Sequence, residues 1–123
     1  MTTYERIQPS VFAGPATWHA LKCYVAKYEP TEQNKRRFKE WIRLTLELFP
    51  CEICSEHALA NFRKHNIDHY LQNKDRLYLY VSMILQDGAN DHKHIPISER
   101  PNYYDSKRFI FESLNGECTS CNH

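Results

Sequence analysis

The apolar residues of this chain recur at helical rather than strand spacing. A first stripe follows Gly14 and Pro15 and repeats every three or four positions: Trp18, Leu21, Val25 and Tyr28. Because proline is tolerated in the first turn of a helix, this pattern predicts a helix that begins at Gly14. The Glu29-Pro30 dipeptide should end it.

The second stripe is the clearest amphipathic pattern in the chain. Thr31 is a typical helix N-cap, and Pro50 breaks the pattern at the other end. Between them, one helical face carries Phe38, Trp41, Ile42, Thr45, Leu48 and Phe49. We therefore predict a helix between Thr31 and Pro50, with this face buried.

The remaining segments complete a helical pattern. We predict a third helix over 51–64, a polar loop over 65–73, and a fourth helix that begins near Lys74 and is ended by Gly88 and the polar run NDHKH at 90–94. The fourth segment contains LYLYVSMIL, which also suits a strand, but its helical stripe and the lack of a partner strand favour a helix. With a short fifth helix over 103–114, the prediction is an all-α antiparallel four-helix bundle.

Chain length and charge narrow the classes of function. The 123 residues suit one domain, which we place at 14–114, between an irregular arm at 1–13 and a mobile tail at 115–123. A formal net charge of +1 gives no electrostatic reason to expect nucleic acid as a partner. We find neither the roughly 18 apolar residues of a membrane span nor a signal-peptide core. A cytoplasmic protein is therefore expected.

Paired cysteines are the most informative chemical feature. Four of the five cysteines form two C-x-x-C pairs, Cys51 with Cys54 and Cys118 with Cys121. A pair at the start of a helix can close a disulfide across one turn, and the free N–H groups there stabilise a thiolate. Such a thiolate exchanges readily with other disulfides. The spacing of each pair therefore suits thiol–disulfide exchange.

The same two pairs also suit a zinc site, so spacing alone leaves both interpretations open. Four thiolates bind zinc, and His57 or His123 can replace a cysteine. The intervening stretch of 63 residues is long for a zinc ribbon, and the second pair follows the last predicted helix. A fixed dithiol visited by a mobile one fits this placement better. Cys23, the fifth cysteine, is expected to be a small buried residue.

Three stretches together resemble the Erv/ALR sulfhydryl oxidases. FPCEICSEH follows a helix that ends in LELFP, and GPATWHAL has the Gly-x-x-x-Trp signature on the first helix. The similarity runs from Gly14 to about Phe111, nearly the whole predicted domain. It implies a small flavoprotein with FAD bound in a four-helix bundle, beside a dithiol at the start of the third helix. No metal is expected.

The resemblance also implies roles for single residues. Trp18 would pack on the flavin, Cys54 would face the flavin, and Cys51 would receive electrons through a mixed disulfide. The remaining cofactor-binding candidates are Gly14, Lys22, Tyr28, His57, Asn90 and Lys93. Plain structural alternatives are core packing for Trp18 and Tyr28, and a solvent-facing position for His57.

The implied reaction passes electrons from thiols to oxygen. Cys118 and Cys121 resemble the shuttle dithiol that some members carry, and FAD would give the electrons to O₂, making H₂O₂. Dithiol proteins, among them a thioredoxin-like carrier, are the implied substrates, and a homodimer is expected. The short chain resembles viral members, which would place it in the host cytoplasm or the virion. The alternative function is a zinc-stabilised helical binding protein without redox turnover.

This chain departs from the family pattern at several positions. The family usually has histidine four residues after the tryptophan, where this chain has Lys22. The fourth helix usually ends in His-Asn-x-x-Asn, but residues 86–90 read QDGAN, so only Asn90 survives. Lys93 or His94 would replace the basic residue that normally follows. The contacts to the adenine and ribose of FAD should therefore differ here.

Overall fold

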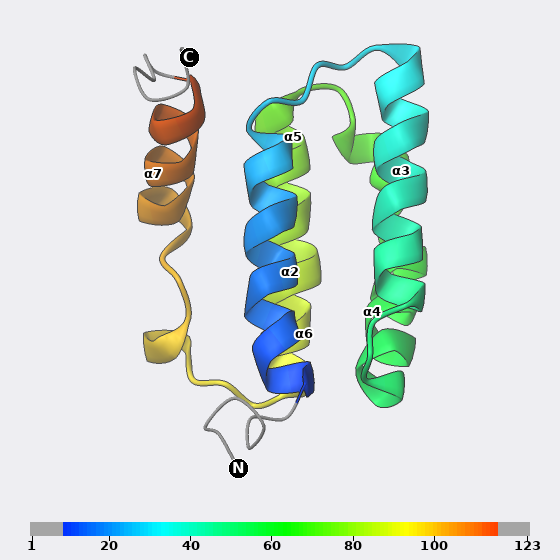
Figure 1. The fold of residues 1–123 in the computed structure, drawn as a ribbon, viewed down its shortest axis with the longest axis vertical. Helices are drawn as coiled ribbons and strands as arrows, with labels where there is room; N and C mark the ends of the chain where they lie inside the picture. Colours follow the sequence, from blue (N-terminus) through cyan, green and yellow to red (C-terminus); the bar gives the residue numbers. More distant parts are fainter. Residues whose placement is uncertain (1–8, 116–123) are drawn as a thin grey trace.

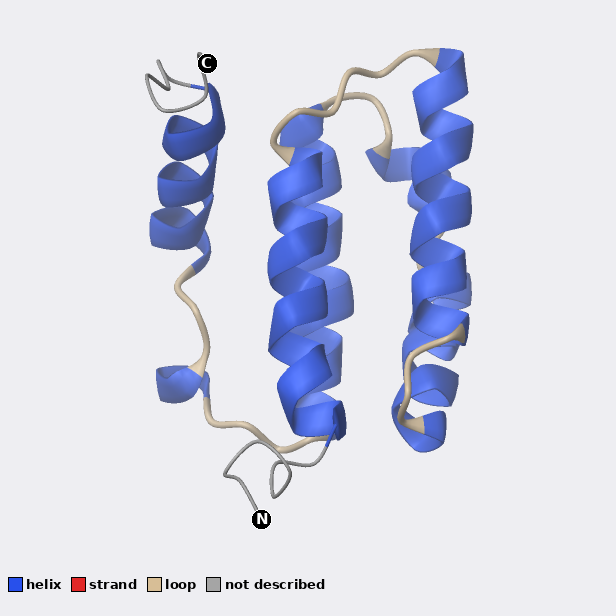
Figure 2. Cartoon of the chain, viewed as in Figure 1, coloured by secondary structure: helices blue, strands red, loops and turns tan. Residues whose placement is uncertain are grey.

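The computed structural model describes residues 9–115, and every regular element in that range is helical. Figure 1 shows the long helices lying side by side with their axes roughly aligned, and Figure 2 shows the loops that join them. The bundle consists of α2 (Pro9–Val25), α3 (Glu32–Glu47), α4 (Glu52–Lys64) and a run of α5 (Lys74–Leu79), η2 (Tyr80–Gln86) and α6 (Asp87–His92). The predicted all-α bundle is confirmed.

Helix α2 begins earlier than the sequence pattern indicates. Its first residue is Pro9, so Pro15 lies inside the helix, and the start predicted at Gly14 was wrong. Pro15 lacks a backbone N–H and therefore removes one hydrogen bond from the second turn. A helix can therefore begin several residues before a proline that lies in one of its early turns.

Helix α3 has the predicted cap and a slightly different buried face. The Asn34 amide donates to the Thr31 hydroxyl at 3.1 Å, which confirms Thr31 as the N-cap. Ile42 is buried as expected, but Leu48 is 77% exposed and Leu46 is buried instead. The buried pair is spaced i, i+4, whereas Leu48 is the C-cap, where the helical repeat ends.

Helix α4 and the segment after it are tied to their neighbours by side-chain hydrogen bonds. The Ser55 hydroxyl donates to the Leu46 carbonyl at 2.6 Å, which fixes the start of α4 against the end of α3. The predicted polar loop contains the short helix η1 (Ile67–Tyr70), and both Ile67 and Leu71 are buried. The segment predicted to be a polar loop therefore contributes two side chains to the core.

The fourth helix contains a π-helical segment, η2, and ends within the predicted polar run at 90–94. It continues through Gly88 to His92, so the part of the prediction in which Gly88 helps to end it was wrong. The Asn61 side-chain amide donates to the Ile84 carbonyl at 2.7 Å, within the π-helical segment. A Cβ at Gly88 would lie 2.5 Å from the Asn61 side-chain nitrogen. Gly88 is there because α4 and α6 approach closely, and it does not end the helix.

The fifth helix packs on the outer side of α2. After η3 (Ile97–Glu99), α7 (Tyr103–Asn115) lies beside α2 on the side away from α3 (Figure 1). Ile110 is buried against the bundle, and the Asn115 side chain donates to the Ala26 carbonyl at 2.9 Å. Helix α7 confirms the fifth helix predicted over 103–114.

Candidate functional site

The Cys51–Cys54 pair lies at the start of α4, as the sequence predicts. Cys51 directly follows Pro50 and is the N-cap of α4. Cys54 lies in the first turn of that helix. The two side chains form a disulfide with their Cα atoms 5.2 Å apart. The Cys54 amide also donates to the Cys51 sulfur at 3.3 Å. Both cysteines are half-buried, so the disulfide lies at the boundary between the bundle interior and its surface.

A cavity of about 30 Å³ lies beside Cys54, and we call it the dithiol cavity. Four helices line it, through Gly14, Thr17, Trp18, Leu46, Phe49, Cys54, Ala58, Ala89 and Lys93. Cys51 is not part of this lining, so the two sulfurs have different surroundings. A Cβ at position 14 would touch both Lys93 and Phe49, at 3.6 and 3.8 Å. Glycine there leaves this side of the cavity without a side chain of its own.

A second cavity, the middle cavity, has a volume of about 390 Å³ and adjoins the first. The two share the lining residues Gly14, Trp18, Ala89 and Lys93. Asn90 lines the middle cavity from α6. Five of the predicted cofactor-binding residues therefore gather around two adjoining cavities: Gly14, Trp18, Cys54, Asn90 and Lys93.

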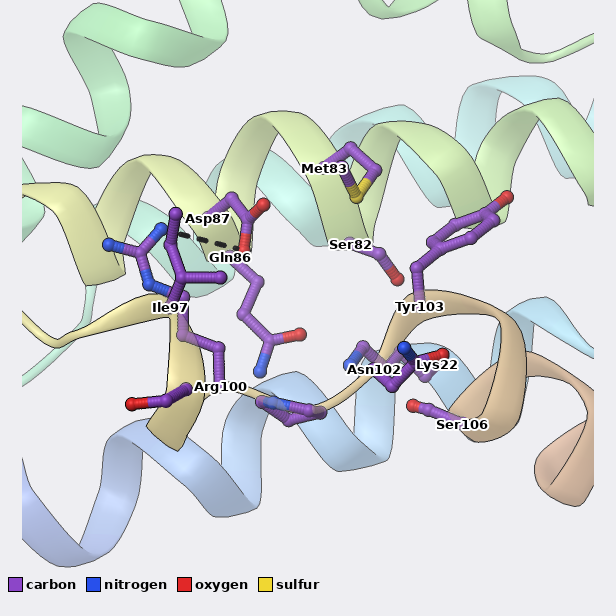
Figure 3. Close-up of a pocket in the computed structure, with 12 residues that line it drawn as sticks. Lys22, Ser82, Met83, Gln86, Asp87, Ile97, Arg100, Asn102, Tyr103 and Ser106 are labelled. Atoms are coloured by element: carbon purple, nitrogen blue, oxygen red, sulfur yellow. Dashed lines mark ion pairs between the residues drawn. The ribbon is translucent and has the colours of Figure 1, made fainter.

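The third cavity, of about 530 Å³, surrounds Lys22, and we call it the lysine cavity (Figure 3). It lies between α2, η2 and the segment that leads to α7. Lys22 is only 5% exposed. Burial lowers the pKa of the Lys22 ammonium, and the nearby Asp87 carboxylate partly offsets this. Among the described residues no hydrogen bond or ion pair reaches this ammonium, which lies 5.9 Å from the centre of the Tyr78 ring.

Ser82 is a second buried polar residue on the lysine cavity, and sequence reasoning missed it. Its side chain is 5% exposed, and its hydroxyl has no hydrogen-bond partner within the described part of the chain. Buried polar groups normally have partners, so Ser82 and Lys22 together indicate that this cavity accepts a polar ligand. The signal available in the sequence was a lone serine within the apolar run LYLYVSMIL.

His57 and Tyr28 lie outside the linings of these three cavities. The His57 ring stacks on His92 with their centroids 4.2 Å apart, which joins α4 to α6. Burial lowers the pKa of His57, and the neighbouring His92 lowers it further, against the attraction of Asp91. Tyr28 is buried at the other end of α2, where its hydroxyl donates to the Leu71 carbonyl at 2.7 Å. This placement favours the core-packing alternative for Tyr28.

Of the three remaining cysteines, the structure describes only Cys23. Cys23 is a half-buried free thiol whose sulfur lies 3.6 Å from the His19 ring. Cys118 and Cys121, the predicted shuttle, lie outside the described residues. Within residues 9–115, no three His, Cys, Asp or Glu side chains gather into a possible metal site. In the same range, no helix is long and apolar enough to cross a bilayer.

Comparison with known proteins gives a match over most of the bundle. Residues 15–84 match the model of the Erv1 / Alr family. The matched range includes α3, α4 and the cysteine pair at the start of α4. The matched range ends within η2, so α6 and the segment that leads to α7 lie beyond it. No curated protein and no solved structure matches the chain.

Proposed function

Because the chain belongs to the Erv1 / Alr family of FAD-dependent sulfhydryl oxidases, we propose that Cys51 and Cys54 are its reacting dithiol. Enzymes of this family oxidise thiols to disulfides and reduce O₂, so thiols and O₂ are the substrates. One observation carries the assignment: Cys54 lines the same cavity as Trp18, while its disulfide partner Cys51 does not.

FAD is the cofactor of the family, and we propose that it binds along the series of three cavities. The dithiol cavity has an aromatic ring beside a sulfur, whereas the lysine cavity has a buried ammonium and an unpartnered hydroxyl. The middle cavity shares residues with both, so the three form one series along α2. A long cofactor with a flat ring, an anionic diphosphate and a polar adenosine suits this series. The residues proposed to hold it are Gly14, Trp18, Lys22, Asn90 and Lys93.

The chain's own chemistry is a thiol–disulfide exchange at Cys51. A substrate thiolate attacks the Cys51 sulfur, the Cys51–Cys54 bond breaks, and Cys54 leaves as a thiolate. The second substrate thiol then displaces Cys51, so the substrate gains a disulfide while the enzyme gains two electrons and two protons. The N–H groups at the start of α4 stabilise both thiolates. FAD, held by the residues that line the three cavities, would supply the acceptor for this electron pair and its transfer to O₂.

Single-cysteine variants test which sulfur reacts with substrate. Cys54→Ser leaves the Cys51 thiolate free to attack the disulfide form of a model substrate, releasing one substrate thiolate and keeping the other sulfur in a mixed disulfide that no Cys54 thiolate can resolve. With the oxidised substrate we therefore expect a trapped covalent adduct, and with the reduced substrate no oxygen uptake, while flavin absorbance is retained. Cys51→Ser should trap no adduct. Cys23→Ser serves as the control and should turn over at the parental rate. A substrate trapped on Cys54 instead of Cys51 would reverse the assigned roles.

We further propose that Cys118 and Cys121 carry electrons from protein substrates to Cys51. The support is their C-x-x-C spacing and their position after the last helix. A thioredoxin-like protein with a surface dithiol is the proposed carrier that delivers electrons to this pair. Cys121→Ser should slow the oxidation of a protein dithiol several-fold more than that of dithiothreitol, which reaches Cys51 directly. Equal losses on both substrates would contradict the shuttle.

A homodimer formed through α2 and α3 is also proposed. Large apolar side chains are exposed on these two helices: Tyr24, Trp41, Leu44 and Leu48. The Tyr24 and Trp41 rings meet edge to face at 5.2 Å, so the two helices present one connected apolar surface. Such a surface is typical of a protein–protein interface.

A further inference from the structure

Residues 95–102, which we call the strap, line one side of the middle cavity and of the lysine cavity. The strap leaves α6 through a Schellman motif, in which the Ile95 amide donates to the Asn90 carbonyl at 2.9 Å and His94 has φ 55°. Arg100 and Pro101 line both the middle cavity and the lysine cavity. A ligand that occupies this series of cavities is therefore enclosed on one side by the strap.

A single side chain fastens the strap. The Arg100 guanidinium, with a side chain only 12% exposed, donates to the Ile95 carbonyl from Nε at 2.9 Å and from Nη2 at 2.7 Å. It also lies 2.8 Å from an Asp91 carboxylate oxygen and 3.9 Å from one of Asp87. The end of the strap is thus bonded to its own beginning and to α6.

Asp87 links this fastening to the lysine cavity. Figure 3 shows its carboxylate directed at Arg100, with the ion pair drawn as a dashed line. The same carboxylate raises the pKa of the buried Lys22 ammonium against the larger effect of burial. Asp87 therefore sits between a cation on α2 and a cation on the strap, which are both buried charges that need a counter-charge.

We propose that Arg100 is a positioning residue that latches the strap over bound FAD and so sets how fast the cofactor leaves. Arg100 does not react, and it acts by holding Pro101 and its neighbours against the cavities. Hydrogen bonds to a charged group that is mostly buried are among the stronger ones in proteins. Their loss should therefore be visible in the rate of FAD release. The inference rests on FAD occupying these cavities and is independent of which cysteine reacts.

The test measures FAD release from the purified holoprotein, as the rise of free-flavin fluorescence after dilution. Arg100→Gln removes the charge and keeps the length, and it should speed release at least about tenfold. Arg100→Lys keeps the positive charge but lacks the several N–H donors of the planar guanidinium. Its rate of FAD release should therefore lie between those of the parent and Arg100→Gln. Arg108→Gln is the matched control, because Arg108 also pairs with a carboxylate, Asp105, but is 70% exposed. It should release FAD at the parental rate.

A second variant and a second measurement separate the latch from a general loss of fold. Asp91→Asn removes one partner of Arg100 at an exposed position, and it should speed release about two- to threefold. The helical circular dichroism of each variant without FAD should match that of Arg108→Gln, because the latch holds the strap and not the helices of the bundle. Release from Arg100→Gln at the rate of Arg108→Gln would overturn the proposal. Should Arg100→Gln fail to fold, parental release from Asp91→Asn would overturn it instead.

Discussion

The two ends of the bundle are built from the same helices and have opposite interiors. At the end near Tyr28, aromatic hydroxyls reach backbone carbonyls: Tyr28 bonds Leu71, and Tyr80 bonds His65 at 2.7 Å. At the end near Cys54, glycine and alanine line the dithiol cavity between the larger side chains. Large residues fill the first end and small residues leave space at the second. This difference underlies our proposal that one end supplies stability and the other supplies space for the cofactor.

The largest expected effect comes from filling the cavity end. Ala89 lines both the dithiol and middle cavities, so Ala89→Leu should occupy space that FAD needs. We expect a colourless protein without oxygen uptake and with an unchanged or raised melting temperature. Ala60→Leu is the control, because Ala60 is an exposed residue of α4, one of the helices that line the dithiol cavity. Full flavin occupancy in Ala89→Leu would show that the cofactor lies elsewhere.

A crossed pair of truncations should separate stability from cofactor binding. Leu77 is fully buried at the packed end, so Leu77→Ala should lower the free energy of unfolding by about 2–5 kcal/mol. It should leave FAD affinity within about twofold. Trp18→Ala should instead weaken FAD at least about tenfold, because the indole lines two of the three cavities.

Two measurements on each variant decide this comparison. Urea unfolding of the FAD-free proteins gives the change in stability, and flavin titration gives the change in affinity. The expected result is a large stability loss for Leu77→Ala and a large affinity loss for Trp18→Ala. Losses of similar size in both measurements for both variants would remove the division between the two ends.

The smallest expected effect is a pH dependence at the cavity end. The folded pKa of His57 is lowered, mainly by burial and then by His92, so the unfolded chain binds the proton more tightly. The contribution of the neutral His57 ring to the stability of the folded protein is therefore complete above about pH 6.5. It is lost as the pH falls through the lower folded pKa of His57. His57→Gln should flatten the melting temperature between pH 7.5 and 5. His69→Gln, an exposed substitution at the packed end, should follow the parental curve.

Much of the fold could be predicted from the sequence, because helical periodicity and caps are local signals. The Thr31 cap and the dithiol at the start of α4 were both predicted correctly. The errors arose where distant contacts override a local rule. Gly88 signals a helix end by its type, but Asn61 on α4 demands a small residue there. Pro15 signals a helix start, yet α2 begins at Pro9.

The site could be predicted only as far as the family motif reaches. Gly14, Trp18, Cys54 and Lys93 were named from the resemblance, and the structure places them around one cavity. Ser82 and Arg100 carried no motif, and their importance lies in burial and in partners that are distant in space or sequence. Periodicity reports which face a residue occupies, and it does not report whether a hydroxyl on that face has a partner.

The hydrogen bond between the Asn115 side chain and the Ala26 carbonyl holds the end of α7 beside the end of α2. Along α2 alone, the distance from Val25 back to Gly14, beside Cys54, is about 17 Å, and the offset between helices adds about 8–10 Å sideways. The end of α7 is therefore anchored at the opposite end of the bundle from the Cys51–Cys54 disulfide.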